Sequence, residues 1–302
     1  MHSGTPPCPR DLPWPGRCAV VGVLNVTPDS FSDGGRFSDA AAAVAHGRRL
    51  ATEGADLIDV GGESTRPGAG RVSADVELER VRPVVAALVA ANVPVSIDTT
   101  RADVAAACLR EGARVVNDVS GGLADPGMAA VVAEAGATWI LMHWRGHSRG
   151  MQQRADYGDV VVDVRTELSR RVDAALAAGV DERSIVLDPG LGFAKRAEHN
   201  LALLDRLDEI TALGLPVLVG ASRKSFLGTV LAEPSGQLRP VEGRECGTLA
   251  TTVIAATAGA WGVRVHDVAC SVDALRVFEA VHGKRRQPLH GAGGSVREKG
   301  SS

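Results

Sequence analysis

The chain has 302 residues, of which 45% are hydrophobic and 23% are charged, and its net charge at pH 7 is −3. This composition is typical of a globular protein and excludes a disordered or fibrous chain. A net charge near zero gives no electrostatic reason to expect a nucleic acid or an anionic membrane as a partner. We therefore expect any bound anion to be held by a few well-placed Lys and Arg side chains.

The cysteines and the two ends of the chain bear on its compartment and its domains. Five scattered cysteines without a CxxC pair argue against a disulfide framework and favour the reducing cytoplasm. No signal peptide is expected at the N-terminus, and the uncharged stretch from Cys246 to Val263 predicts a buried helix rather than a membrane span. We expect a loose Pro-rich tail over residues 1–16, one domain over 17–283 and a second loose tail over 284–302.

Between the tails, one pattern recurs: an amphipathic stretch, then Gly or Asn, then a short apolar run that ends in polar residues. Such runs predict strands buried on both faces, and the Gly suits the left-handed end of a helix. The predicted strands lie near 18–24, 56–61, 94–98, 114–119, 138–142, 184–188, 217–221 and 262–266. The predicted helices lie near 39–53, 73–91, 101–111, 126–135, 159–178, 198–213, 244–260 and 271–281.

Eight strand–helix units predict a single α/β domain, a closed (β/α)8 barrel. An open doubly wound sheet is the alternative, but no G-x-G-x-x-G follows the first strand. In a barrel of this kind, the active site lies at the carboxyl ends of the strands. Polar residues end all eight predicted strands: Asn25, Gly61–Arg66, Asp98, Asn117–Asp118, His143, Asp188, Ser222–Lys224 and Arg264–Asp267.

Three of these strand ends carry hydrogen-bond acceptors: Asp98, Asn117 and Asp188. Carboxylate and amide oxygens at the floor of a dry pocket suit a ligand edge rich in N–H donors, such as a guanidine-like or aminopyrimidine edge. Taken singly, each residue is about as well explained as a helix cap. Taken together, the three favour a ligand.

Positive charge gathers at the same predicted mouth, on Arg66, Lys224, Arg264 and His266. A convergent cluster of this kind indicates a phosphate or diphosphate group, whereas most other Arg side chains are expected to be solvated. Arg264 and His266 are separated by a single residue on a predicted strand, so their side chains should point to the same face.

Two polar, Gly-containing segments, 25–35 and 61–71, are expected to be loops that close over the mouth and exclude water. Ordinary connections between strands and helices are the alternative for both. No Ser-His-Asp or Cys-His order is evident, and HWRGH (143–147) is only a weak metal motif. A Mg²⁺ ion held mainly by ligand phosphates would need no more than one protein oxygen, such as that of Asn25.

Eight segments in family order make the chain resemble the bacterial dihydropteroate synthases of the folate pathway. They are GVLNVTPDSFSDGG (22–35), DLIDVGGESTRPGA (56–69), VSIDTTRADVA (95–105), VVNDVSGG (115–122), LMHWRG (141–146), VLDPGLGFAK (186–195), LVGASRKSFLG (218–228) and GVRVHDV (262–268). The resemblance implies a TIM barrel, a homodimer, and the condensation of a dihydropterin diphosphate with 4-aminobenzoate to give 7,8-dihydropteroate and diphosphate. In this family the diphosphate departs first, and the aniline nitrogen then attacks the resulting cation.

The resemblance also implies a role for particular residues. The pterin would be held by Asp98, Asn117, Asp188 and Lys224, with Arg264 stacked on its face. The diphosphate would be held by Thr65, Arg66, Arg264 and His266. The aminobenzoate pocket would be shaped by Phe31, Thr65, Pro67, Lys224 and Ser225. Asn25 would ligate Mg²⁺, and Asp33 would steady the first loop near the metal.

Because sulfonamides mimic aminobenzoate, the intact Phe31, Thr65–Pro67 and Ser225 positions predict a sulfonamide-sensitive enzyme. Two other functions would share part of this pattern. A pterin-dependent methyltransferase barrel would share the acceptor set but would not need the cations of the mouth. A non-catalytic paralogue that only binds pterin should have lost loop residues such as Asn25 or Asp33. This chain retains both.

Overall fold

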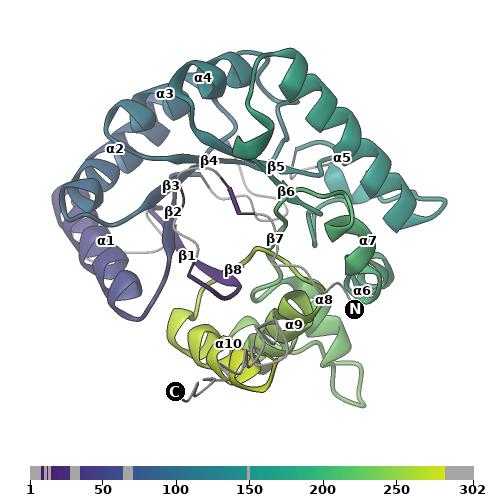
Figure 1. Ribbon diagram of the computed structural model, residues 1–302. Coiled ribbons are helices and arrows are strands. Elements are labelled where there is room, and N and C mark those ends of the chain that lie inside the picture. Colours follow the sequence, from purple (N-terminus) through teal and green to yellow (C-terminus); the bar gives the residue numbers. More distant parts are fainter. Residues whose placement is uncertain are drawn as a thin grey trace, which may run out of the picture.

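The computed structural model describes residues 8–9, 12, 15–27, 35–63, 71–147 and 150–282. Its eight strands are all parallel and pair in the order β6-β5-β4-β3-β2-β1-β8-β7, and a bridge from Leu187 to Val217 joins β6 to β7. The helices form a ring outside the strands (Figure 1). The predicted (β/α)8 barrel is therefore confirmed.

The strands are short, as expected for buried parallel strands. They are β1 (Ala19–Asn25), β2 (Leu57–Gly61), β3 (Val95–Asp98), β4 (Val115–Asp118), β5 (Thr138–Met142), β6 (Ile185–Asp188), β7 (Leu218–Val219) and β8 (Gly262–Val265). β1 pairs with β2 on one side and with β8 on the other, where Ala19 lies opposite Gly262. The first and last strands of the sequence therefore share one seam of the barrel.

The α-helices follow the strands. They are α1 (Gly35–Thr52), α2 (Ala74–Ala90), α3 (Ala102–Arg110), α4 (Met128–Ala135), α5 (Val160–Ala177), α6 (Ala197–Asp205), α7 (Leu207–Thr211), α8 (Ser225–Val230), α9 (Glu245–Thr257) and α10 (Val268–His282). The glycines of the repeated sequence pattern, Gly54, Gly112 and Gly136, all have positive φ, which only glycine adopts at little cost. They turn the chain from one helix toward the next strand.

Two features differ from the sequence prediction. The helix expected over 198–213 is interrupted at Arg206, whose φ of −111° and ψ of 34° lie outside the helical region. The short helix α8 was not predicted, since Gly228 in its interior gives the segment a weak helical tendency. The guanidinium of Arg244 packs where a side chain at Gly228 would lie, so a larger residue here would displace it.

The barrel interior has an apolar lower part. Its buried side chains are Leu12, Ala19, Val21, Leu57, Val115, Ile140, Val186, Leu218 and Trp261. Leu12 is only 9% exposed, although it belongs to the segment expected to be a loose tail. Residues 284–302 and most of 1–16 lie outside the described residues, so the division into domain and tails stays a prediction.

A polar layer lies directly above this apolar part. Side chains of a strand alternate between its two faces, so the residue two positions after an interior residue also faces the interior. Leu57, Val115 and Val186 are followed in this way by Asp59, Asn117 and Asp188. The fold thus places acids and amides at the carboxyl ends of the strands, where this class of barrel carries its sites. Among the described residues, no helix is long and apolar enough to cross a membrane.

Candidate functional site

The centre of the polar layer is a guanidinium that bridges two buried carboxylates. Arg264 Nε donates to Asp59 Oδ2 at 2.6 Å, and its Nη2 donates to Asp98 Oδ2 at 2.8 Å. Asn117 Nδ2 donates to the same Asp59 oxygen at 2.8 Å. These four side chains come from β8, β2, β3 and β4, and together they form a fixed floor.

Burial changes the acidity of this floor. Burial raises the pKa of Asp98 to about 7, and the neighbouring carboxylate of Asp59 adds to the rise, while Arg264 opposes it. Burial also lowers the proton affinity of Arg264, but Asp59 and Asp98 more than offset this, so its pKa is raised and it stays charged. Arg264 thus favours the ionised form of Asp98 against the effects of burial and of the neighbouring acids.

Gly220 marks the point where three predicted residues meet. A Cβ placed on this glycine would lie 3.7 Å from Lys224 Nζ, 3.8 Å from Arg264 Cβ and 3.9 Å from Asp188 Oδ2. Because glycine has no side chain, residue 220 puts no atoms of its own between these three groups. The structure therefore brings together the residues that were predicted to bind one flat polar molecule.

Asp188 and Lys224 are held by neighbouring backbone. Asp188 Oδ1 accepts from the N–H of Gly190 at 2.7 Å, and burial raises the pKa of the carboxyl while Lys224 opposes the rise. Lys224 donates to the carbonyl of Leu191 and lies 4.6 Å from the centre of the Phe193 ring. Burial lowers the pKa of Lys224 to about 8, against the attraction of Asp188.

His266 follows the last residue of β8 rather than lying within the strand. Its Nδ1 is 2.9 Å from Ser222 Oγ, and the same hydroxyl accepts from the His266 backbone N–H at 3.2 Å. A hydroxyl that donates its proton to Nδ1 leaves the proton of the ring on Nε2. Ser222 therefore holds the imidazole in one orientation.

The remaining predicted residues lie at the rim or outside the described part of the chain. Asn25 is the last residue of β1 and is half-buried, and its side chain bonds to no residue that the structure describes. Ser225 is the first residue of α8 and is exposed. The other predicted site residues, Phe31, Asp33, Thr65, Arg66 and Pro67, all lie outside the described residues.

Sequence reasoning missed Asp59, which is 0% exposed and central to the floor. Its signal was an acid in the middle of the apolar run LIDVG. It also missed Lys195, a buried lysine that lies 2.9 Å from His143 Nδ1. Asp118, the last residue of β4, has a structural role instead, because it accepts from the backbone N–H groups of Ser120 and Gly122 in the turn that follows.

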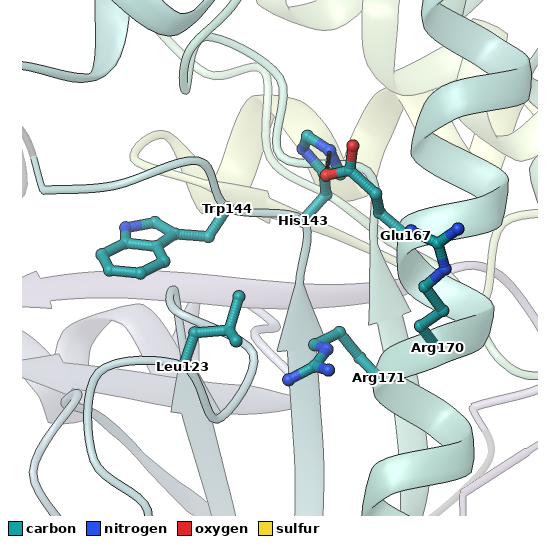
Figure 2. Close-up of a pocket in the computed structure, with 6 residues that line it drawn as sticks. All are labelled: Leu123, His143, Trp144, Glu167, Arg170 and Arg171. Atoms are coloured by element: carbon teal, nitrogen blue, oxygen red, sulfur yellow. Dashed lines mark hydrogen bonds and ion pairs between the residues drawn. The ribbon is translucent and has the colours of Figure 1, made fainter.

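A separate cavity of about 180 Å³ lies beside the end of β5, against α5 (Figure 2). It is lined by Leu123, His143, Trp144, Glu167, Arg170 and Arg171. None of the residues predicted to bind pterin lines it. Within the ranges that the structure describes, no group of three His, Cys, Asp or Glu side chains is placed to hold a metal ion.

Known proteins resemble this chain over most of its length. The family described as pterin binding enzyme matches residues 21–266. A dihydropteroate synthase from Mycobacterium leprae is 60% identical over 262 residues, which are 86% of this chain and 92% of that protein.

Solved structures agree. The dihydropteroate synthase of Xanthomonas albilineans with 4-aminobenzoic acid is 46% identical, with a TM-score of 0.81 over 88% of this chain and 93% of that chain. The Yersinia pestis enzyme in complex with a sulfonamide drug is 41% identical, with a TM-score of 0.83 over 91% and 98% of the two chains. The chain therefore belongs to the dihydropteroate synthases, a family of pterin-binding enzymes.

Proposed function

We propose that the protein is a transferase of folate biosynthesis. It condenses (7,8-dihydropterin-6-yl)methyl diphosphate with 4-aminobenzoate to give 7,8-dihydropteroate and diphosphate. The observation that carries this proposal is the polar layer, in which buried acceptors and cations converge around Gly220. The related enzyme from Xanthomonas albilineans has been solved with 4-aminobenzoic acid, which agrees with this second substrate.

The acceptors bind the N–H-rich edge of the pterin in this proposal. Asn117 gives its N–H to Asp59, so its amide oxygen stays available as an acceptor. Asp98 and Asp188 supply charged acceptors, which form stronger hydrogen bonds than neutral ones. Lys224 binds the pterin from the rim, and the guanidinium of Arg264, fixed by two carboxylates, stacks on the ring face.

The chemistry needs no protein nucleophile. The bond between the methylene carbon of the pterin and the diphosphate oxygen breaks, and the electron pair leaves with the diphosphate. The aniline nitrogen then bonds to the carbon and loses a proton. The protein contributes by stabilising the departing anion with His266, Arg264, Arg66 and Thr65, and by excluding water that would trap the cation.

Asn25 is the residue proposed to ligate Mg²⁺. Its amide oxygen is a hard donor of the kind that Mg²⁺ accepts, and it stands half-buried at the mouth without a bond to a described residue. One protein oxygen would be enough, since Mg²⁺ commonly takes its remaining ligands from substrate phosphates and water. A bound Mg²⁺ would supply positive charge next to the leaving group, and Asp33 would steady the first loop near this site.

The aminobenzoate pocket is proposed to be formed by Phe31, Thr65, Pro67, Lys224 and Ser225. Of these, Lys224 and Ser225 are described, and they are neighbours at the start of α8. The cation of Lys224 suits the carboxylate of the substrate or the sulfonyl group of a competing sulfonamide. We expect sulfonamides to inhibit the enzyme, as the complex of the Yersinia pestis relative with such a drug suggests.

We also propose that residues 17–283 act as one domain in a cytoplasmic homodimer. Large apolar side chains are exposed on two neighbouring helices, Val253 and Ile254 on α9 and Val277 and Val281 on α10. A second copy of the chain would bury these side chains and gain hydrophobic stabilisation.

The function is tested by diphosphate release from purified protein supplied with the dihydropterin diphosphate and Mg²⁺, with and without 4-aminobenzoate. Release that depends on aminobenzoate, with dihydropteroate formed in equal amount, is expected. Tight pterin binding without this product would instead identify a non-catalytic pterin-binding protein.

A pH dependence follows from Asp98. Its carboxylate must be ionised to accept from the pterin, and its pKa is about 7. Protonation removes the acceptor, so kcat/KM for the pterin should fall by up to about tenfold per pH unit below pH 7. A pH–rate profile checks this, and the fall in kcat/KM below pH 7 should be absent from the Asp98→Asn variant. A profile that is flat through pH 7 would contradict the role of Asp98.

Gly220→Ala separates ligand binding from folding. The added methyl would meet its neighbours at 3.7 to 3.9 Å, which is ordinary van der Waals contact, so the fold should be unaffected. The methyl would occupy space proposed for the pterin, so KM for the pterin should rise by about tenfold or more, the equivalent of ~1.4 kcal/mol. Gly158→Ala is the matched control, because a Cβ there meets nothing within 4 Å.

A further inference from the structure

Lys195 is a buried cation that the proposed mechanism does not use. The sequence has only four lysines, at positions 195, 224, 284 and 299, and Lys195 is 3% exposed. Its Nζ lies 2.9 Å from His143 Nδ1, 3.0 Å from the carbonyl of Gly190 and 3.1 Å from the carbonyl of Phe193. Three acceptors match the three N–H donors of an ammonium group. The protein therefore uses all of this cation's donors on itself.

His143 connects Lys195 to the cavity beside α5. Because Nδ1 accepts from Lys195, the ring carries its proton on Nε2, which is 2.9 Å from Glu167 Oε2 (Figure 2). Burial lowers the pKa of His143 to about 4, so the ring is neutral at pH 7. Burial works against the charge of Glu167, but hydrogen bonds from His143 and Arg145 lower its pKa to about 2. The histidine is thus fixed in one tautomer.

A single residue, Gly190, links Lys195 to the proposed pterin acceptor Asp188. Lys195 holds the carbonyl of Gly190, and the N–H of Gly190 donates to Asp188 Oδ1 at 2.7 Å. The backbone N–H of His143 donates to the carbonyl of Asp188 at 2.9 Å. Gly190 has φ +67°, and a Cβ on it would lie 2.5 Å from the carbonyl oxygen of His143. No larger residue therefore fits at this position of the turn. Both sides of the Asp188–Gly190 turn are therefore tied to the Lys195–His143 pair.

Lys195 and Asp188 also affect each other's pKa through their charges. Burial raises the pKa of Asp188, and the positive charge of Lys195 is one of the influences that oppose the rise. Burial lowers the pKa of Lys195 to about 7, and the attraction of Asp188 opposes that change. Each group therefore favours the charged form of the other. An ionised Asp188 accepts hydrogen bonds from N–H donors, whereas a protonated one has lost part of that capacity.

We propose that Lys195 is a positioning residue for pterin recognition, which holds the Asp188–Gly190 turn in place and keeps the Asp188 carboxylate charged without touching the substrate. Glu167 supports this role, because it orients the His143 ring whose Nδ1 accepts from the ammonium group of Lys195. The inference rests on the proposed role of Asp188 in binding the pterin. The charged or titratable groups that face Lys195 and Asp188 are His143, Arg145, Glu167, Lys224 and Arg264.

The main test is Lys195→Met, which keeps the length of the side chain and removes its charge. The pKa of Asp188 should rise, and each unit by which it exceeds the pH leaves about tenfold less carboxylate. The dissociation constant for the dihydropterin diphosphate, measured by isothermal titration calorimetry at pH 7, should increase about tenfold or more. The loss should grow as the pH falls, because a lower pH protonates the more basic Asp188 of the variant first.

Steady-state kinetics separate positioning from a general structural defect. KM for the pterin should rise, while KM for aminobenzoate and kcat at saturating pterin stay within about twofold of the wild type. A loss of kcat with both KM values unchanged would show only a smaller active fraction and would overturn the proposal. An unchanged pterin affinity in folded Lys195→Met would overturn it too.

A second pair of variants keeps the test decisive if Lys195→Met does not fold. His143→Asn offers an amide oxygen close to the former Nδ1 position, whereas His143→Leu leaves the ammonium one acceptor short. The Asn variant should retain more pterin affinity than the Leu variant, and equal affinities would count against the proposal. Asp188→Asn serves as the reference: no loss there would refute the role of Asp188 itself, whereas a loss there but not in the Lys195 and His143 variants would refute this inference alone.

Discussion

Replacing Arg264 by Ala should abolish dihydropteroate formation and destabilise the barrel in the same variant. The guanidinium is bonded to both Asp59 and Asp98, and Asp59 is fully buried. Removing one partner of a buried ion pair leaves an uncompensated charge and costs about 3 to 5 kcal/mol. We expect the unfolding midpoint to fall by ~10 °C, as measured by thermal denaturation of wild type and variant.

Two further variants separate the roles of this side chain. Adding Asp59→Asn to Arg264→Ala removes the stranded charge, so part of the lost stability should return while activity does not. Arg276→Ala is the control, because Arg276 is 71% exposed and makes only a surface pair with Asp273. An Arg264→Ala variant as stable as the wild type would show that the ion pairs do not hold the floor together.

His266→Ala should lower kcat by about 100- to 1,000-fold, the range found when one donor to a developing anion is removed. The imidazole is oriented by Ser222 at 2.9 Å, and its role is to stabilise the departing diphosphate. Because the leaving group gains a further negative charge only in the transition state, the dissociation constant for the pterin substrate should rise much less than kcat falls. Single-turnover kinetics with calorimetric binding would measure the two effects.

Ser222→Ala provides the graded comparison, since it removes the hydroxyl that orients the ring but leaves the imidazole in place. Its kcat should fall less than that of His266→Ala. Equal turnover in His266→Ala and the wild type would be incompatible with a role in diphosphate departure, and a loss confined to pterin affinity would move His266 to the binding floor.

Most of the fold could be predicted because its signals are local. Each strand is a short apolar run, and glycines such as Gly54, Gly112 and Gly136 turn the chain at the points where the pattern placed them. The break at Arg206 and the helix α8 were not predictable in this way. The packing of Arg244 against Gly228 depends on a contact between segments that lie apart in the sequence.

The site residues likewise differ in whether a local sequence signal reveals them. Asp98 and Asp188 end their strands, and Asn117 and Arg264 lie one residue before the end of theirs, so the barrel topology alone brings them to one mouth. Asp59 lies within a strand, and only the three-dimensional structure shows that it accepts from Arg264, 205 residues later in the chain. Lys195 has no local signal, because its importance comes from burial and its partner His143 is 52 residues away.

The pairing of β1 with β8 has a consequence for the newly made protein. As the chain leaves the ribosome, β1 finds β2 early, but its other edge stays open until residues 262–265 have been synthesised. Arg264 arrives on that last strand, so the acids of the floor are without their guanidinium until the same moment. Closure of the sheet and neutralisation of the binding floor therefore coincide, and a nascent chain that stops short of β8 has neither.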